Sequence, residues 1–176
     1  MRSIQTQALD ALARRSLHHD PEELRWLLDH GAKLDKDAIM ITTNTFAGSP
    51  ASVSPAVIAV LIQHEGIQAF AGTRLLQQAS RYGQTEVVKM LLDAGADPNE
   101  EVPAPAHDWR EGSTLALRGA IIGRHPEIVW LLLVHGARAD SVAGDGGRGA
   151  VDLARRVGGR AVVRLLEDHV GVKSKM

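Results

Sequence analysis

A short apolar phrase ending in glycine and alanine recurs along this 176-residue chain. It reads LRWLLDHGAKLD from Leu24, EVVKMLLDAGADPN from Glu86 and EIVWLLLVHGARAD from Glu127. The equivalent positions are 35, 29, 41 and 34 residues apart, at Gly31, Gly66, Gly95, Gly136 and Val170. A phrase that returns at periods of about 20 to 50 residues indicates repeated architecture, so we expect five similar structural units.

Apolar residues at helical spacing precede each phrase and predict a buried helix. These clusters are Leu24–Leu28, Val57–Ile62, Val87–Leu92, Ile128–Leu133 and Val162–Leu166. A shorter helix pattern lies upstream of each, at Ile4–Ser16, Asp37–Thr45, Arg74–Tyr82, Leu115–Ile122 and Ala150–Val157. Each unit is therefore helix, tight turn, helix and extended loop. Because no unit can bury its apolar face alone, the five are expected to stack into an all-α solenoid.

The ends of these helices carry their own signals. A capping candidate and a proline open three second helices, at Asp20-Pro21, Ser54-Pro55 and His125-Pro126. Glycine after a helix supplies the left-handed conformation that a C-terminus commonly needs. Four histidines, His30, His64, His135 and His169, recur at or near the helix end. At a helix end an imidazole can hydrogen-bond the free carbonyls, so we expect these histidines to act as caps. A metal site is not expected, because residues one repeat apart belong to different units and need not converge on one point.

The repeat pattern resembles one known family. GTRLLQQASRYGQTEVVKMLLDAGADPN at 72–99 is similar to the ankyrin repeat without a gap, and Gly147–Asp168 aligns likewise. The resemblance implies one ankyrin-type domain over 1–176, with repeats near 4–35, 36–68, 69–101, 112–143 and 144–172. The family's Thr-Pro-Leu-His element is intact nowhere, and Thr114 lies one residue out of register. We therefore expect apolar packing to hold the stack.

Two insertions interrupt the repeats, and insertions in repeat proteins map to loops. FAGSPASVSP occupies 46–55, and EEVPAPAHDWREG occupies 100–112. The second contains Pro-Ala-Pro, which cannot be helical, and lacks strand alternation, so we interpret it as a projecting finger loop.

Composition excludes several classes of protein. The net charge of −1 gives no general attraction to nucleic acid or to an anionic membrane. Without cysteine the chain has no disulfide, thiolate zinc site or cysteine nucleophile. The charged N-terminal segment lacks the apolar core of a signal peptide, and no apolar run is long enough to cross a bilayer. A cytoplasmic monomer is the expectation.

No motif predicts catalysis, a metal or a cofactor. Phosphate loops, nucleophile elbows, metalloprotease helices and dinucleotide fingerprints are missing. The glycine-rich AGDGGRGA at 143–150 follows no strand, which favours a flexible loop over a phosphate site. His18-His19-Asp20 falls on a turn with no further ligand at regular spacing. We expect a protein that is not an enzyme and holds no cofactor or metal.

Protein binding is the function that remains. By resemblance to the family, contacts would come from the concave helix surface and the loop tips. The candidate residues are Thr73, Arg81, Tyr82, His107, Trp109, Arg110, Arg148 and Arg156. Trp109 is either an exposed anchor or a side chain that pins the finger to the stack. Trp26 aligns with a core position, whereas Trp130 aligns with a solvent-facing one.

The charges of two segments could orient a partner. Residues 97–111 have five acids against one base, a local −4, and residues 148–176 have seven bases against three acids, a local +4. The leading hypothesis is a non-catalytic module that binds another protein. An inhibitor or immunity-type protein that blocks an enzyme or toxin is the alternative. By resemblance, Asn99 is also a candidate substrate of an asparagine hydroxylase.

Overall fold

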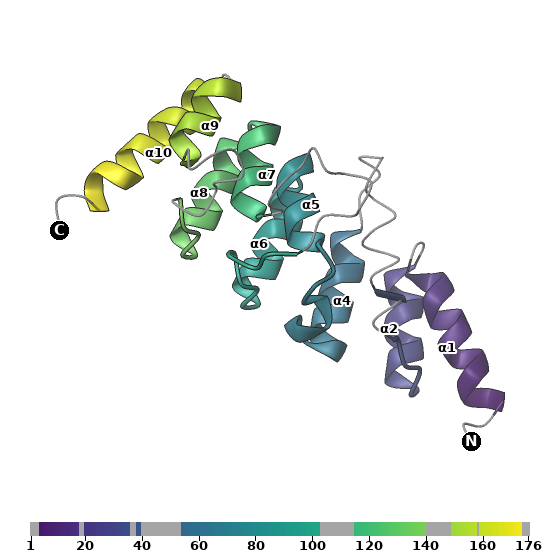
Figure 1. Ribbon diagram of the computed structural model, residues 1–176. Coiled ribbons are helices and arrows are strands. Elements are labelled where there is room, and N and C mark those ends of the chain that lie inside the picture. The colour runs from purple at the N-terminus through teal and green to yellow at the C-terminus, as the bar shows by residue number, and fades with distance from the viewer. Residues whose placement is uncertain are drawn as a thin grey trace. The chain divides into compact units, whose positions relative to one another are not determined.

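The computed structural model describes residues 4–17, 20–35, 38–39, 54–102, 115–139, 149–157 and 159–173. Every regular element within these ranges is a helix, which confirms the predicted all-α fold class for the described chain (Figure 1). The chain divides into two compact units, Met1–Leu75 and Leu76–Met176. The single ankyrin-type domain stays a prediction.

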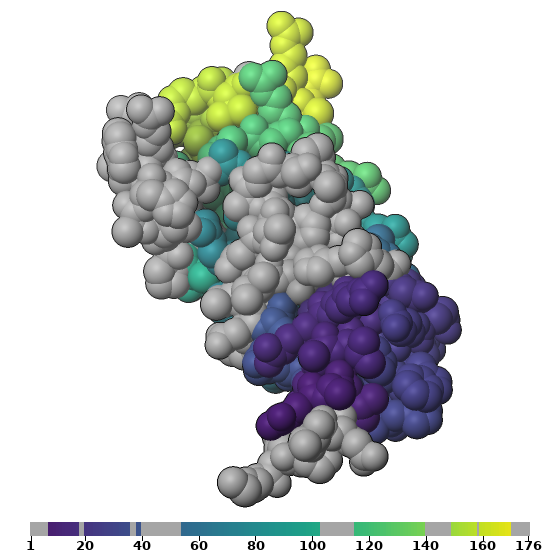
Figure 2. All heavy atoms as spheres, turned by 90° about the vertical axis from the view of Figure 1, so that its right-hand side faces the viewer, coloured from purple at the N-terminus to yellow at the C-terminus, as the bar shows by residue number. Residues whose placement is uncertain are grey.

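The first unit contains α1 (Ile4–Ser16), α2 (Pro21–Asp29), α4 (Pro55–Glu65) and the 3-10 helix η1 (Ile67–Phe70). Helix α2 packs against both α1 and α4. Figure 2 shows the side chains of α1 and α2 closely packed, in purple and blue. The largest fully buried side chains of this unit are Leu24, Ile39, Ile58, Leu61, Val57 and Val60. These side chains come from the predicted apolar clusters and from Ile39 of the upstream pattern.

Polar contacts hold the loop after α2 against α1. Arg14 forms an ion pair with Asp35, and the backbone N–H of Lys33 donates to the Asp10 carboxylate at 2.7 Å. Residues 38 and 39 are helical, and the rest of the predicted helix at 37–45 lies outside the described residues.

The second unit holds three helix pairs: α5 (Leu75–Tyr82) with α6 (Thr85–Asp93), α7 (Ala116–Gly123) with α8 (Pro126–Val134), and α9 (Ala150–Val157) with α10 (Arg160–Lys173). We call α5, α7 and α9 the first-helix row, and α6, α8 and α10 the second-helix row. Helix α7 contacts α9, while α8 contacts both α6 and α10 (Figure 1). The predicted unit of two helices therefore recurs here three times.

Helix boundaries follow the sequence signals closely. Helices α1 and α9 have the predicted bounds. Helix α5 begins at Leu75, one residue late, because Arg74 has a φ of 65° and lies outside the right-handed helical region. Helix α7 is shifted by one residue, because Leu115 is extended and takes the N-cap position.

The predicted caps are confirmed in part. Asp20 accepts hydrogen bonds from the N–H groups of Glu22 and Glu23 at 2.9 and 3.1 Å. Ser54 and His125 occupy N-cap positions, but neither side chain makes a cap hydrogen bond, so the capping prediction is wrong for these two. The glycines after the second helices have positive φ, from 74° to 94°, at Gly31, Gly66, Gly95 and Gly136. The predicted left-handed stop fits the positive φ of Gly31, Gly95 and Gly136, whereas Gly66, with a ψ of 168°, is not left-handed helical.

Two of the four histidines cap as predicted. The Nδ1 groups of His30 and His135 donate to the carbonyls of Trp26 and Leu131, at 2.7 and 2.8 Å. His64 instead reaches the preceding helix, with Nε2 3.2 Å from Asp29 Oδ1. For His169 the prediction is wrong, because it lies within α10 and its Nε2 is buried without a hydrogen bond.

Glycine lets the first-helix row pack closely. A Cβ atom at Gly119 would stand 3.1 Å from the carbonyl oxygen of Gln77, and one at Gly123 would stand 2.3 Å from that of Arg81. The His125 ring fills the space beside Gly123, and its Nε2 donates to the Arg81 carbonyl at 3.1 Å. Helices α5 and α7 therefore meet through backbone and one imidazole.

Aliphatic side chains hold the second-helix row together. The side chains that are at most 1% exposed in this row are Val88, Leu91, Ile128, Val129, Leu132, Val162 and Leu166. Outside this core, Asn99 connects two successive loops: its Nδ2 donates to the Gly136 carbonyl at 3.0 Å, and its Oδ1 accepts from the Arg138 N–H at 2.9 Å. Asn99 therefore has a structural role, and its hydroxylation stays a prediction.

Candidate functional site

The end of α5 presents two of the predicted contact residues, Arg81 and Tyr82. Tyr82 is 37% exposed, whereas Arg81 is half-buried and contributes its carbonyl to the His125 contact. The turn that follows is possible because Gly83 has a φ of 78° and its hydrogen leaves room for the His125 ring. The tight α5–α6 turn thus positions Tyr82 at the surface.

The same position differs along the first-helix row. In the repeat register Tyr82 corresponds to Gly123 at the end of α7 and to Val157 at the end of α9. Gly123 has no side chain, and the close approach of the Arg81 carbonyl excludes one. Arg81 corresponds to Arg156, which is exposed on α9. This end of the row therefore carries one tyrosine and two arginines around a position that has no side chain.

Thr73 has a different position from the one the sequence predicted. Its side chain is 0% exposed, and its hydroxyl donates to the Phe70 carbonyl at 2.7 Å and accepts from the Leu75 N–H at 3.4 Å. The hydroxyl closes the turn between η1 and α5. Thr73 is part of the framework, so we leave it out of the proposed contact surface. His107, Trp109, Arg110 and Arg148 lie outside the described residues, as does most of both predicted insertion loops.

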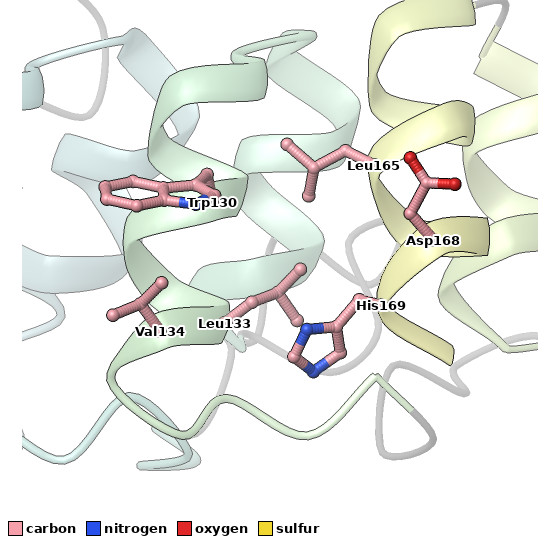
Figure 3. A pocket seen from close by; sticks show the side chains of 6 residues that line it. All are labelled: Trp130, Leu133, Val134, Leu165, Asp168 and His169. Atoms are coloured by element: carbon pink, nitrogen blue, oxygen red, sulfur yellow. The ribbon is translucent and has the colours of Figure 1, made fainter. Parts of the chain in front are cut away.

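A second surface feature lies on the second-helix row. A groove of about 360 Å³ is lined by Trp130, Leu133 and Val134 of α8 and by Leu165, Asp168 and His169 of α10. Figure 3 shows these side chains on the two neighbouring helices, with Leu165 and His169 directed from α10 toward α8. Trp130 is 54% exposed and Val134 is 60% exposed. The solvent-facing position predicted for Trp130 is confirmed, but the sequence did not reveal its companions on α10.

The core position predicted for Trp26 is wrong. Trp26 is 55% exposed, and its ring stacks on His30 with the ring centroids 3.9 Å apart. Leu24, Leu27 and Leu28 form the buried face of α2. Because successive helical residues differ by about 100°, position 26 turns away from that face.

The described residues hold neither a candidate metal site nor a membrane-spanning helix. No group of three or more His, Asp or Glu side chains within them could hold a metal ion. His18 and His19 lie outside the part of the chain that is described. None of the described helices combines the length and the apolar character needed to cross a membrane.

Paired helices that repeat along a chain define a helical-repeat protein. Residues 72–101, which contain α5 and α6, match the family model of the ankyrin repeat. The chain thus carries an ankyrin repeat, and the helix pairs around it are consistent with that family. Ankyrin repeats are generally modules of protein–protein interaction and are typically not enzymes. No curated protein matches the sequence of the chain at a significant level.

Proposed function

We propose that the chain is a non-catalytic module that binds a partner protein through the first-helix row and the finger loop at 100–112. The observation that carries this proposal is the exposed Tyr82 in the segment that matches the ankyrin repeat. Tyrosine and arginine are enriched among the residues that dominate binding energy at protein interfaces. Arg81 and Arg156 place two such arginines in the same register on α5 and α9.

Packing supports a preformed surface. Helix α5 is joined to α7 by the Gly119 and Gly123 contacts and by His125. A partner that binds a rigid surface does not have to order it, which lowers the entropic cost of association. In this proposal Trp109 and His107 of the finger add contacts, and the acidic 97–111 segment selects a partner with a basic patch.

Affinity purification from the source cell tests this function. The full chain is compared with Tyr82→Ala, Arg156→Ala and the control Glu86→Ala, which changes an exposed residue of α6 in the same repeat. We expect specific proteins to be retained by the parent and by Glu86→Ala, and to be lost or strongly reduced with Tyr82→Ala. Retention that is equal for all four chains would show that this surface is not the binding site.

The same material distinguishes a plain binding module from an inhibitor. If a retained partner has enzymatic or toxic activity, that activity is measured with and without the purified chain. Loss of activity that the parent causes and Tyr82→Ala does not would assign the inhibitory role. Unchanged activity in a stable complex would assign binding alone.

A further inference from the structure

The groove on α8 and α10 goes beyond the proposed function, because its residues belong to the second-helix row. Four of its six lining residues are apolar: Trp130, Leu133, Val134 and Leu165. Adjacent exposed apolar side chains cost free energy in water and commonly mark a contact site. The volume of about 360 Å³ falls in the range of ligand-binding pockets.

The two acidic residues next to each other on α10 differ in their contacts. Glu167 accepts a hydrogen bond from Arg155 of α9, at 2.6 Å. Asp168 lines the groove, and no ion pair or hydrogen bond involves it within the described structure. Arg164, one turn earlier, does not line the groove and makes no ion pair with Asp168. The groove therefore has an apolar floor and one unneutralised carboxylate.

In the repeat register, Asp168 corresponds to Asp29 of α2 and Asp93 of α6, and both of these acids have a partner. Asp29 lies beside His64 at 3.2 Å, and Asp93 lies beside His135 at 3.5 Å. Asp168 differs from them because no basic group lies within ion-pair distance of it in the described structure. His169 also lines the groove, and its Nε2 is buried without a hydrogen bond in the described structure. Unsatisfied buried polar atoms are rare in folded proteins.

We propose that this groove binds a short segment of a partner protein that carries a large aliphatic side chain next to a lysine or arginine. The aliphatic side chain would pack on Trp130, Val134 and Leu165. The cation would pair with Asp168, and the face of Trp130 offers it a further attraction. Six residues line the groove, whereas stable protein interfaces use about 20 to 30 on each side, which favours a short segment over a second copy of this chain.

The test uses the full chain and three capped hexapeptides, which alternate leucine with lysine, leucine with glutamate, or serine with lysine. Binding is followed by NMR through the indole N–H resonance of Trp130, assigned with Trp130→Phe. We expect the leucine–lysine peptide to shift this resonance in a saturable way. The leucine–glutamate peptide should bind about fivefold more weakly, because it loses one partly exposed ion pair. The serine–lysine peptide should give no saturable shift.

Two variants separate the charge from the apolar floor. Asp168→Asn should weaken the leucine–lysine peptide by about fivefold and abolish the preference over leucine–glutamate. Val134→Ser should weaken both leucine peptides without affecting the fold, since Val134 is 60% exposed. Trp26 provides an internal control: it is 55% exposed, stacks on His30 and does not line this groove, so its resonance should not move.

Several results would overturn the proposal. Equal affinity for the lysine and glutamate peptides would exclude the role of Asp168. Equal shifts at Trp26 and Trp130 would show unspecific adhesion to exposed indoles. Trp130 shifts that depend on protein concentration without peptide would identify a second copy of the chain as the occupant. None of these results depends on the partner of the first-helix row, so the two proposals fail separately.

Discussion

The two helix rows of residues 76–139 come from the same repeats but are joined in different ways. In the first-helix row, α5 and α7 meet at glycine and backbone, with one imidazole between them. In the second-helix row, α6 and α8 are joined by aliphatic side chains such as Val88 and Leu132. Substitutions that add atoms should therefore lower the free energy of unfolding most in the first-helix row. Substitutions that remove atoms should lower it most in the second-helix row.

The largest effect is expected from a cavity in the second-helix row. Leu132 is 0% exposed, and Leu132→Ala should lower the free energy of unfolding by about 3 kcal/mol, from lost burial and the cavity left behind. Urea denaturation followed by circular dichroism measures this loss. Val134→Ala on the same helix is the control, and at 60% exposure it should cost less than about 0.5 kcal/mol. Similar losses for both variants would contradict the assigned core.

A single added methyl group should destabilise the first-helix row. Gly123→Ala places a Cβ 2.3 Å from the Arg81 carbonyl oxygen, which is backbone and cannot rotate away. We expect a loss of about 2 kcal/mol in the same denaturation experiment. Gly119→Ala, with a contact of 3.1 Å, should cost less, about 1 kcal/mol. If both variants were as stable as the parent, the close approach of α5 and α7 would be wrong.

Removing the Asn99 hydrogen bonds that connect two successive loops should lower the stability less than the substitutions in either helix row. Asn99→Ala removes the hydrogen bonds to the Gly136 carbonyl and the Arg138 N–H, for an expected loss of about 1 to 2 kcal/mol. Asn99→Asp keeps the acceptor for Arg138 but not the donor to Gly136. Faster amide hydrogen exchange at Arg138 should appear in Asn99→Ala and be weaker in Asn99→Asp. Unchanged exchange in Asn99→Ala would exclude the connection.

The smallest effect is expected from the contact between Asp93 of α6 and His135, the C-cap residue of α8. His135 Nε2 lies 3.5 Å from Asp93 Oδ1, and Asp93 is 56% exposed, so water and salt weaken the attraction. Asp93→Asn should change the free energy of unfolding by less than about 0.5 kcal/mol. Repeating the urea titration at low and high salt checks this value. A loss comparable to that of Leu132→Ala would mean that polar contacts hold the second-helix row.

The sequence predicted the helices well, because periodicity and turn residues are local signals. Ile4–Ser16 and Ala150–Val157 agree with α1 and α9 at both ends. Errors arose where a single residue departs from the pattern. Arg74 has a positive φ, which is not predictable from an arginine in the sequence, so α5 starts one residue later than predicted. Trp26 was assigned to the core by repeat alignment, although its neighbours fill the buried face of α2.

The candidate sites were less predictable, because they depend on tertiary contacts. Thr73 fits the family's contact position, but its hydroxyl closes the turn before α5. The groove combines Trp130 with Leu165 and Asp168, which only the packing of α8 against α10 brings together. The one local sequence signal for the groove was the solvent-facing position of Trp130 in the predicted helix. The sequence places Glu167 and Asp168 side by side and could not show that only Glu167 pairs with Arg155.

The affinity of the first-helix row for its partner tests the central claim most directly. Once a partner has been purified, isothermal titration calorimetry compares the parent with Tyr82→Ala and with Glu86→Ala. A residue that anchors an interface contributes about 2 kcal/mol or more, so Tyr82→Ala should weaken binding by about thirtyfold while Glu86→Ala binds like the parent. Equal dissociation constants for all three proteins, with their folds intact, would contradict the proposed binding surface.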